Sequence, residues 1–424
     1  MDPIILNLSL YRSSNKTVEN VAKEIGWTVT KVSEKVDNTY TIIWLHRTSY
    51  ASRIKTLQSY QRINRFPYSF VFGNKSNFAK IFEGKRSLLQ DDFNFYPKTF
   101  LLPNEFSEFK TYASSHDETF IIKPNDGSCG EGIILTKDVK EVEKYNDSIV
   151  QTYISNPLKI EGKKFDLRVY CLIMSVDPLI VYVYKEGIVR ICTEEYQPPS
   201  EENFSKGYMH LTNYALNKQN KEKFSEVIAG NYFVGNKRSF KFFRHWLENE
   251  MKVNSDEVFG KIEDVVLKSI MAFTPFLREK YRMCMKGENK GGSFTCFELL
   301  GVDVMFDEDY NPWLMEINCS PSLSRDTPFD EDLKIGLIKE TLFLVGINPK
   351  RRANTLIRNV LMKLKYDGAN ISKEMMEMVK QPDRKEDFEN MQKAEEKYLN
   401  MYKKVYPTEE NEKRFEHIIK KFDI

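Results

Sequence analysis

The segment Cys296–Leu323 constrains the fold most strongly, because two apolar runs flank a turn-rich centre. The apolar runs occupy residues 301–306 and 313–317, and the centre between them reads Asp-Glu-Asp-Tyr-Asn-Pro. Apolar runs on either side of a short turn-forming stretch are typical of a β-hairpin. We therefore predict two antiparallel strands joined by a tight turn.

A turn centred just after Asp309 predicts how the two strands pair. Reflection of the sequence about that point places Asp303 opposite Glu316. It also places Gly301 opposite Asn318. Side chains alternate between the two faces of a sheet, so Asp303, Glu316 and Asn318 are expected on one face. Two carboxylates and one amide oxygen then converge within runs that otherwise have the composition of a buried core.

A bound cation would explain this convergence. Buried carboxylates without compensation are unfavourable, and like charges directly opposite each other in a sheet repel. A cation removes both penalties, and a ligand set made only of oxygen atoms suits Mg²⁺. The alternative is an ordinary hairpin whose acidic side chains face solvent, and this segment alone does not decide between the two.

The composition is that of an ordinary soluble protein. The 424 residues are enough for two or three domains, with 41% hydrophobic residues, 29% charged residues and a net charge of +2. The six cysteines form no CxxC pair and the N-terminus shows no secretory segment, so reduced thiols in the cytosol are expected. Neither zinc nor a membrane is expected, because the five histidines lack zinc-site spacing and no apolar run reaches spanning length.

Positive charge is concentrated in two blocks. Residues 47–86 carry nine Lys or Arg against one acid, and residues 350–365 carry six with no acid. In the second block Arg351, Arg358 and Lys365 recur every seven residues, which places them close to one helical face. Such blocks attract an anionic partner, either nucleic acid or an acidic protein segment. A solvated helix face is the alternative interpretation.

A glycine-rich loop lies between two further β-type runs, at residues 119–124 and 133–135. The first run ends with Lys123, and the loop contains three glycines. Glycine lets backbone amides approach a phosphate closely, and lysine supplies compensating charge. We predict a flap that closes over phosphates, with a ligand-free glycine turn as the alternative.

Alternation in the segment 164–170 predicts a strand with one charged face. Lys164, Asp166 and Arg168 fall on that face, next to an apolar run at 171–174. These charges need either a polar ligand or mutual pairing.

Further elements follow from apolar periodicity and turn residues. A strand at 179–184 is expected to turn at Glu186-Gly187 into another strand at 188–191. The predicted helices span residues 17–25, 73–89, 105–114, 240–250, 256–282 and 333–345, and the charged tail 350–424 is also expected to be helical.

Together these motifs resemble the ATP-grasp fold and, within it, the tubulin tyrosine ligase-like family. The resemblance rests on IIKPNDGSCGEGI, VQTYI, KFDLRVY, VYKEGIVR, MHLTNYALNK and LLGVDVMFDEDYNPWLMEINCSPSL, which occur in family order. It covers about residues 4 to 345 and implies a mixed α/β (α+β) fold. The expected parts are an N-terminal α/β subdomain (1–66), a central subdomain with the glycine loop (67–155), a C-terminal ATP-grasp subdomain (156–345) and a basic helical, microtubule-binding extension (346–424).

The resemblance also implies ATP and two Mg²⁺ ions, and it assigns roles residue by residue. The implied metal ligands are Asp303, Glu316 and Asn318. The implied ATP-binding residues are Lys75, Lys123, Gly130, Glu131, Gly132, Gln151, Thr152, Tyr153, Ile154, Lys164, Phe165, Asp166, Thr212 and Asn213. The implied catalytic residues are Arg168 and Arg190, with Arg190, Tyr214 and Lys237 at the incoming amino acid and Glu131 and Cys319 near the protein acceptor.

The implied activity is that of the polyglutamylase branch. Such an enzyme activates a carboxylate as an acyl phosphate and ligates free L-glutamate, through an isopeptide bond, to glutamate side chains in acidic tubulin tails. Glu131 and Cys319 depart from the branch pattern, which leaves open both initiation versus elongation and the amino acid added, so a tyrosine or glycine ligase is the alternative. An alternative of another class is a catalytically silent microtubule-binding protein. Tubulin or microtubules are the expected partner, without nucleic acid or membrane, for a monomer of the cytoplasm and cytoskeleton. The cilium, flagellum and basal body are further candidate locations.

Overall fold

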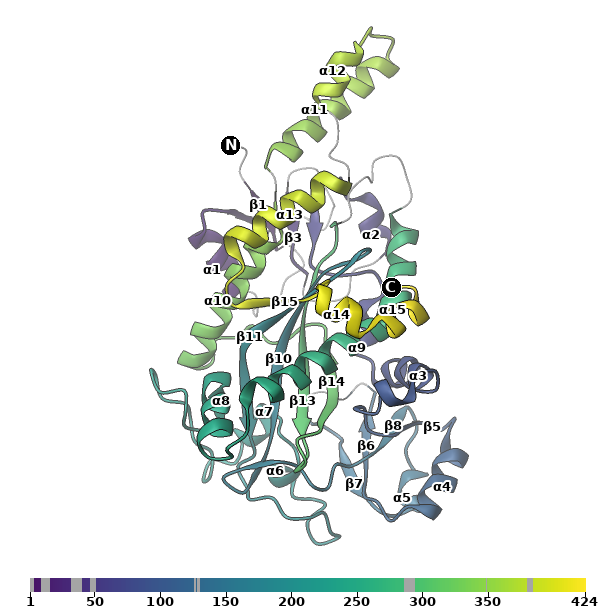
Figure 1. Cartoon of the computed structure of the whole chain (residues 1–424), viewed down its shortest axis with the longest axis vertical. Coiled ribbons are helices and arrows are strands. Elements are labelled where there is room, and N and C mark those ends of the chain that lie inside the picture. Colours follow the sequence, from purple (N-terminus) through teal and green to yellow (C-terminus); the bar gives the residue numbers. More distant parts are fainter. Residues whose placement is uncertain are drawn as a thin grey trace.

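The computed structural model describes most of the chain. The described residues are 4–8, 16–31, 40–45, 51–125, 127, 130–285, 294–347, 349–379 and 384–424, with the side chains of 349–351 and 384–387 left aside. Three sheets organise it, with helices on their faces (Figure 1). Among the described residues, none of the helices combines the length and apolar character needed to cross a bilayer.

The largest sheet lies at the centre of the molecule. Its main path runs β12-β11-β10-β13-β14, while β15 pairs with β11 and β9 with β10. The strands are β9 (Lys159–Ile160), β10 (Lys163–Val176), β11 (Leu179–Ile191), β12 (Lys237–Ser239), β13 (Glu298–Phe306), β14 (Pro312–Asn318) and β15 (Tyr402–Tyr406). These pairings are antiparallel, so sequence neighbours such as β13 and β14 form hairpins.

Two smaller sheets complete the body. A parallel sheet of order β2-β1-β3-β4 contains β1 (Ile5–Asn7), β2 (Thr28–Thr30), β3 (Ile42–Ile43) and β4 (Arg62–Ile63). An antiparallel sheet of order β5-β8-β6-β7 contains β5 (Thr99–Leu102), β6 (Phe120–Pro124), β7 (Ile134–Thr136) and β8 (Ser148–Thr152). The predicted strand–glycine loop–strand unit is therefore confirmed as the β6–β7 hairpin, although Asp126, Ser128 and Cys129 lie outside the described residues.

The helices cover the sheets and connect them. In the first half of the chain these are α1 (Lys16–Glu24), α2 (Ala51–Thr56), the 3-10 turns η2 (Ser69–Phe72) and η3 (Gln90–Asp92), α3 (Lys75–Arg86), α4 (Phe106–Ser115), α5 (Val139–Val142), α6 (Gly207–His210) and α7 (Tyr214–Asn217). In the second half these are α8 (Phe240–Asn249), α9 (Ser255–Cys284), α10 (Pro328–Leu344), α11 (Pro349–Tyr366), α12 (Lys373–Met378), α13 (Arg384–Tyr398), α14 (Glu409–Arg414) and α15 (Glu416–Phe422).

The two faces of the central sheet bury different side chains. On β10, Leu167 and Val169 point to the face covered by α8 and α9, whose Phe243 and Ile270 lie in the same core cluster. The opposite face carries Leu172, which shares a second cluster with residues of α1 and α10. Farther along that second face the apolar cover ends, and polar side chains of β10 line a cavity.

The predicted turn at Glu186-Gly187 was wrong. β11 continues through these residues, and the irregularity appears as a shift of the β10–β11 register between Val169 and Cys171. A side chain at Gly187 is excluded, because an added Cβ would lie 2.4 Å from the Phe240 ring. The glycine therefore permits close packing of α8 rather than a turn.

The C-terminal segment is not a purely helical extension. Its strand β15 joins the central sheet beside β11, and α15 packs against α9. Among its described elements, α11 and α12 project away from the body (Figure 1). A short strand that buries Tyr402, Val405 and Tyr406 without strict alternation is easily overlooked within a charged tail that also contains Lys403 and Lys404.

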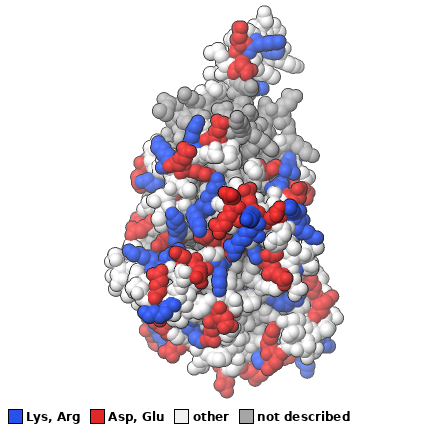
Figure 2. Space-filling model, viewed as in Figure 1, with Lys and Arg blue, Asp and Glu red and all other residues white. Residues whose placement is uncertain are grey.

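The first basic block does not form one positive surface. Arg62 and Arg65 are buried, and Arg65 lies 3.5 Å from the Glu298 carboxylate. Arg86 pairs with Glu83 at 2.7 Å. Arg47 lies outside the described residues. Figure 2 shows acidic and basic side chains interspersed over the visible face of the body.

Candidate active site

The predicted hairpin and its pairing are confirmed. Asp303 lies opposite Glu316, and Gly301 lies opposite Asn318. The turn itself differs from the prediction: nearer to it the register shifts by one residue, and Val304 pairs with Leu314. A bulge at Met315 therefore separates a turn centred on Asp309 from the correctly predicted pairs.

The carboxylates of the hairpin are close together. Asp303 is 2% exposed, and the side-chain amide of Asn318 donates to a Glu316 oxygen at 3.0 Å. Burial raises the pKa of Glu316, and the negative charge of Asp303 raises it further. Burial would also raise the pKa of Asp303, but the charges of Arg168 and Arg190 outweigh it and hold that pKa well below its usual range.

The arginines are paired with carboxylates from neighbouring strands. Arg168 makes a two-point contact with Asp303, in which its Nη2 donates at 2.9 Å. Arg190 donates to both oxygens of Asp166 at 2.7 and 2.5 Å, and also lies 2.8 Å from Asp303. Thr212 donates to Asp166 at 2.6 Å. Mutual pairing within the charged face of β10 is therefore not observed, because Asp166 and Arg168 pair with side chains of the neighbouring strands.

Two buried lysines have neutral partners instead. Lys123 donates to the Gln151 side chain at 2.8 Å, and Lys164 donates to the Tyr153 hydroxyl at 2.9 Å. Within the described part of the chain neither forms an ion pair with a carboxylate. Burial lowers the pKa of Lys123 to about 8 and that of Lys164 to about 8. Two desolvated ammonium groups without counter-ions are what an anion-binding site requires.

A cavity of about 570 Å³ brings these groups together. It lies between the β5–β8 sheet with its glycine loop on one side and the central sheet on the other. Most residues assigned by the family resemblance line it: Lys75, Lys123, Gly130, Glu131, Gln151, Thr152, Tyr153, Ile154, Lys164, Asp166, Arg168, Arg190, Thr212, Asn213, Tyr214, Lys237, Asp303, Glu316 and Asn318. Lys75 also donates to the backbone oxygen of Gly127 at 2.8 Å, which ties α3 to the glycine loop.

Three of the assigned residues do not line the cavity. Phe165 is fully buried on the opposite face of β10, where its ring lies 5.6 Å from that of Phe243. The period of two explains this, since Phe165 stands between Lys164 and Asp166. Gly132 adopts a left-handed φ of 69° at the base of the loop.

Cys319 is the third assigned residue that does not line the cavity. Its thiol donates to the backbone oxygen of Ser69 at 3.0 Å and points away from the cavity. Burial raises the pKa of this thiol far above its usual range. A contact between Cys319 and a protein acceptor, as the resemblance implied, is therefore not supported by the geometry.

Sequence reasoning missed the residues that α10 brings to the cavity. The helix begins at Pro328 rather than at residue 333, with Thr327 as its N-cap, and it places Asp330 and Lys334 in the cavity wall. The signal was present: Thr-Pro marks a helix start, and the spacing of four puts Asp330 and Lys334 on one helical face.

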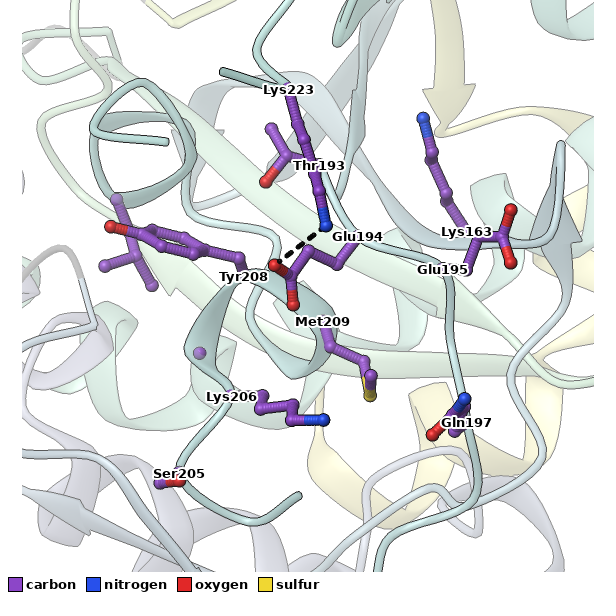
Figure 3. Close-up of a pocket in the computed structure, with 12 residues that line it drawn as sticks. Lys163, Thr193, Glu194, Glu195, Gln197, Ser205, Lys206, Tyr208, Met209 and Lys223 are labelled. Atoms are coloured by element: carbon purple, nitrogen blue, oxygen red, sulfur yellow. Dashed lines mark hydrogen bonds and ion pairs between the residues drawn. The ribbon is translucent and has the colours of Figure 1, made fainter. Parts of the chain in front are cut away.

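A neutral histidine stabilises the wall between this cavity and a second hollow. His210 accepts from or donates to the Tyr153 hydroxyl at 3.0 Å, and burial lowers its pKa to about 4. On the far side of α6 lies an open hollow of about 950 Å³ (Figure 3). Its Lys223 pairs with Glu194 at 3.3 Å and is exposed. Such solvated charges of both signs contrast with the buried lysines of the cavity.

The hairpin is a chemically suitable metal site. Among the described residues, no group of three His, Cys, Asp or Glu side chains has metal-binding geometry. The candidate set instead consists of two carboxylates and the amide oxygen of Asn318. These are the oxygen donors that Mg²⁺ prefers, and the Asp303–Glu316 contact would be relieved by a cation.

Comparison with known proteins gives a consistent result. A profile of the tubulin-tyrosine ligase family matches residues 53–355. The chain is 32% identical over 420 residues to human tubulin polyglutamylase TTLL13, covering 96% of this chain and 49% of the relative. It is 35% identical over 345 residues to human tubulin polyglutamylase TTLL6, covering 81% and 37%. It is 33% identical over 405 residues to tubulin polyglutamylase TTLL7 of Xenopus tropicalis, covering 88% and 43%.

The chain spans half or less of the length of these curated relatives. The matched region nevertheless contains both sheets that enclose the cavity, apart from β15. The mixed α/β architecture agrees with the ATP-grasp-like fold expected from the sequence motifs. Since the family profile covers well over half of the chain, this protein belongs to the tubulin-tyrosine ligase family.

Proposed function

We propose that this protein is an ATP-dependent tubulin polyglutamylase. It ligates free L-glutamate, through an isopeptide bond, to glutamate side chains in the acidic C-terminal tails of tubulin. The observation that carries the proposal is the cavity, where two buried lysines with neutral partners face a hairpin with two carboxylates. The names of the relatives support tubulin as the substrate.

The nucleotide is held by the lysines and the glycine loop. Lys123 and Lys164 supply positive charge to the phosphates of ATP, with Lys75 and the loop at 130–132 alongside. The backbone of residues 151–154 offers hydrogen-bonding groups to the adenine edge. The ribose and phosphates of ATP lie toward Asp166, Thr212 and Asn213.

ATP serves to activate the acceptor carboxylate as an acyl phosphate. The amine of glutamate then attacks this acyl phosphate and displaces phosphate.

Asp303, Glu316 and Asn318 would hold two Mg²⁺ ions, which offset the negative charge of the phosphates when bound. The support for this is the donor set and the raised pKa of Glu316, because a carboxylate that is buried against another is stabilised by a cation. The protein residues do the positioning, which contributes up to about 7–11 kcal/mol in well-oriented reactions.

Arg168 and Arg190 act at the carboxylates that react. Both already hold carboxylates of the chain in a two-point geometry, which is the geometry that binds an acceptor glutamate or an incoming amino acid. Tyr214 and Lys237 lie on the amino-acid side, and Glu131 lies at the exposed mouth, on the acceptor side.

The projecting helix α11 is the proposed microtubule contact. Lys363 and Lys365 are exposed on it, and the sequence of the helix contains no acid. Acidic tubulin tails have the complementary charge. We further propose that the protein acts as a monomer at the cytoskeleton, in the cytoplasm or in a cilium, flagellum or basal body.

The test is mass spectrometry of tubulin tails after incubation with ATP, Mg²⁺ and one amino acid at a time. Additions of one glutamate mass are expected with glutamate and with no other amino acid. Tyrosine or glycine additions would replace this proposal by the corresponding ligase of the same fold. Normal cellular function of a Glu316→Gln variant would instead favour a silent microtubule-binding protein.

A further inference from the structure

A cluster of three buried charges lies at one end of the cavity, where α10 begins beside β12. Lys237 comes from β12, and Asp330 and Lys334 come from α10. Lys237 lies 2.7 Å from one oxygen of Asp330, and Lys334 lies 2.8 Å from the other. Their exposed fractions are 5% for Lys237, 0% for Asp330 and 3% for Lys334. Two ammonium groups therefore share one carboxylate.

The shared carboxylate also has a third partner. Besides its contacts with the two lysines, Asp330 accepts a hydrogen bond from the Thr327 hydroxyl at 2.9 Å. The next acid in the cavity wall, Asp326, is exposed and forms no ion pair with either lysine within the described residues. One buried positive charge is therefore in excess, and such a charge is unfavourable unless an anion accompanies it.

The same end of the cavity also contains a hydrogen-bond donor without an acceptor among the described residues, the hydroxyl of Tyr214. Lys237 lies 3.8 Å from the centroid of the Tyr214 ring. The Tyr214 hydroxyl is buried and makes no hydrogen bond within the described part of the chain. Tyr214, Lys237 and Lys334 all line the cavity. Excess positive charge together with an unsatisfied donor suits a carboxylate ligand.

We propose that Lys334 is a second cation of the amino-acid site. Lys237, Lys334 and the Tyr214 hydroxyl together bind the carboxylate of the incoming amino acid that Arg190 does not hold, and Asp330 positions the two lysines. This inference rests on the proposed function. It also explains selectivity: an amino acid with a neutral side chain leaves the excess charge uncompensated, whereas a dicarboxylic amino acid neutralises it.

The first experiment compares Lys334→Met with Lys339→Met in steady-state ligation. Lys339 lies on the same helix, but it is exposed and pairs with Glu24 at 2.7 Å. Lys334→Met is expected to raise the KM for glutamate at least tenfold and the KM for ATP less than twofold. Lys334→Arg should recover most of the glutamate affinity, and Lys339→Met should behave like the wild type.

An unchanged KM for glutamate in Lys334→Met would overturn the proposal. So would an equal rise of both KM values with a lowered Tm, because that pattern indicates a structural role alone.

A second measurement needs no variant and no ligation. Wild-type protein with ATP and Mg²⁺ is treated with an amine-acylating reagent, and modification of Lys237 and Lys334 is read by mass spectrometry. Millimolar glutamate is expected to protect both lysines, whereas glutamine, its amide, is not. Equal reactivity with both ligands contradicts the carboxylate site. Absence of glutamate transfer to tubulin would contradict the proposed function instead, and the two failures are thus distinguishable.

Discussion

Two arginines and two lysines of the cavity are in opposite electrostatic situations. Arg168 and Arg190 are bound by the carboxylates of Asp303 and Asp166, at distances down to 2.5 Å. Lys123 and Lys164 are more deeply buried than the arginines, but their partners are the neutral side chains of Gln151 and Tyr153. Both pairs line the same cavity: Lys164 and Arg168 lie on β10, Arg190 lies on β11, and Lys123 lies on β6 of the other sheet.

The difference separates two kinds of function. The arginines are already compensated, so they stabilise the fold and orient the carboxylates around the candidate metal site. The lysines are uncompensated, so their burial is unfavourable until an anion binds. In this comparison the arginines contribute to stability through carboxylates of the chain before they meet a substrate carboxylate, whereas the charges of the lysines are compensated only when an anion binds.

The largest effect is expected for Asp303→Asn, because this carboxylate belongs to the ion pairs and to the candidate metal site. Breaking a buried ion pair costs about 3–5 kcal/mol of unfolding free energy. Ligation should also fall by about 10²–10³-fold. Urea unfolding and initial rates measure the two effects. Asp309→Asn, an exposed acid in the turn of the same hairpin, is the control and should change neither.

The lysine pair is tested by Lys123→Met set against Arg168→Met. Lys123→Met should weaken ATP binding about 10–100-fold, as expected for loss of a charged hydrogen bond. Its unfolding free energy at pH 7 should stay the same or rise by up to about 3 kcal/mol, because an uncompensated buried charge is removed. Arg168→Met should lower stability. Calorimetry measures ATP binding and urea unfolding measures stability. Destabilisation by Lys123→Met would contradict the contrast between the lysines and the arginines.

The pH dependence follows from the lowered pKa of both lysines, about 8 in the folded chain. Above that pH the ammonium groups lose protons, so ATP affinity should fall about tenfold per lysine between pH 7 and 9. Without nucleotide, the unfolded chain binds more protons than the folded chain between pH 8 and 10.5. The free energy of unfolding should therefore rise as the pH increases through that range. Titration of ATP binding at several pH values checks the first statement, and Lys123→Met should show a shallower dependence.

The cations of α11 extend the comparison to a helix outside the cavity, and Lys363 and Lys365 are exposed on it. Replacing Arg351, Arg358 and Lys365 by Glu should weaken microtubule co-sedimentation about five- to tenfold at low salt, and less at high salt. Glutamylation of a soluble tail peptide should not change. Lys413→Glu with Lys421→Glu, on exposed parts of α14 and α15, is the control. Unchanged co-sedimentation of the α11 variant would contradict the proposed microtubule contact.

The smallest effect is expected for Cys319→Ala. The thiol donates to the Ser69 backbone and does not line the cavity, so the KM for a tail peptide should change less than about twofold. Steady-state kinetics with the peptide measure this. A large change would restore the acceptor role that the family pattern suggests and the geometry does not support.

The sequence by itself determined the hairpin and the charged faces of the strands. The pairing of Asp303 with Glu316 follows from turn residues and a period of two, both of which are local. The same period places Lys164, Asp166 and Arg168 on one face. It also excludes Phe165 from that face, an inference that the local pattern already allowed.

Only the tertiary structure decided which charges meet. Arg168 pairs with Asp303 across 135 residues and Lys237 with Asp330 across 93, and the tail returns β15 to the edge of β11. The bulge at Gly187 likewise depends on the ring of Phe240 from a distant helix. Periodicity specifies the face of a side chain and not what covers that face, because partners far apart in sequence are selected by packing of the whole chain.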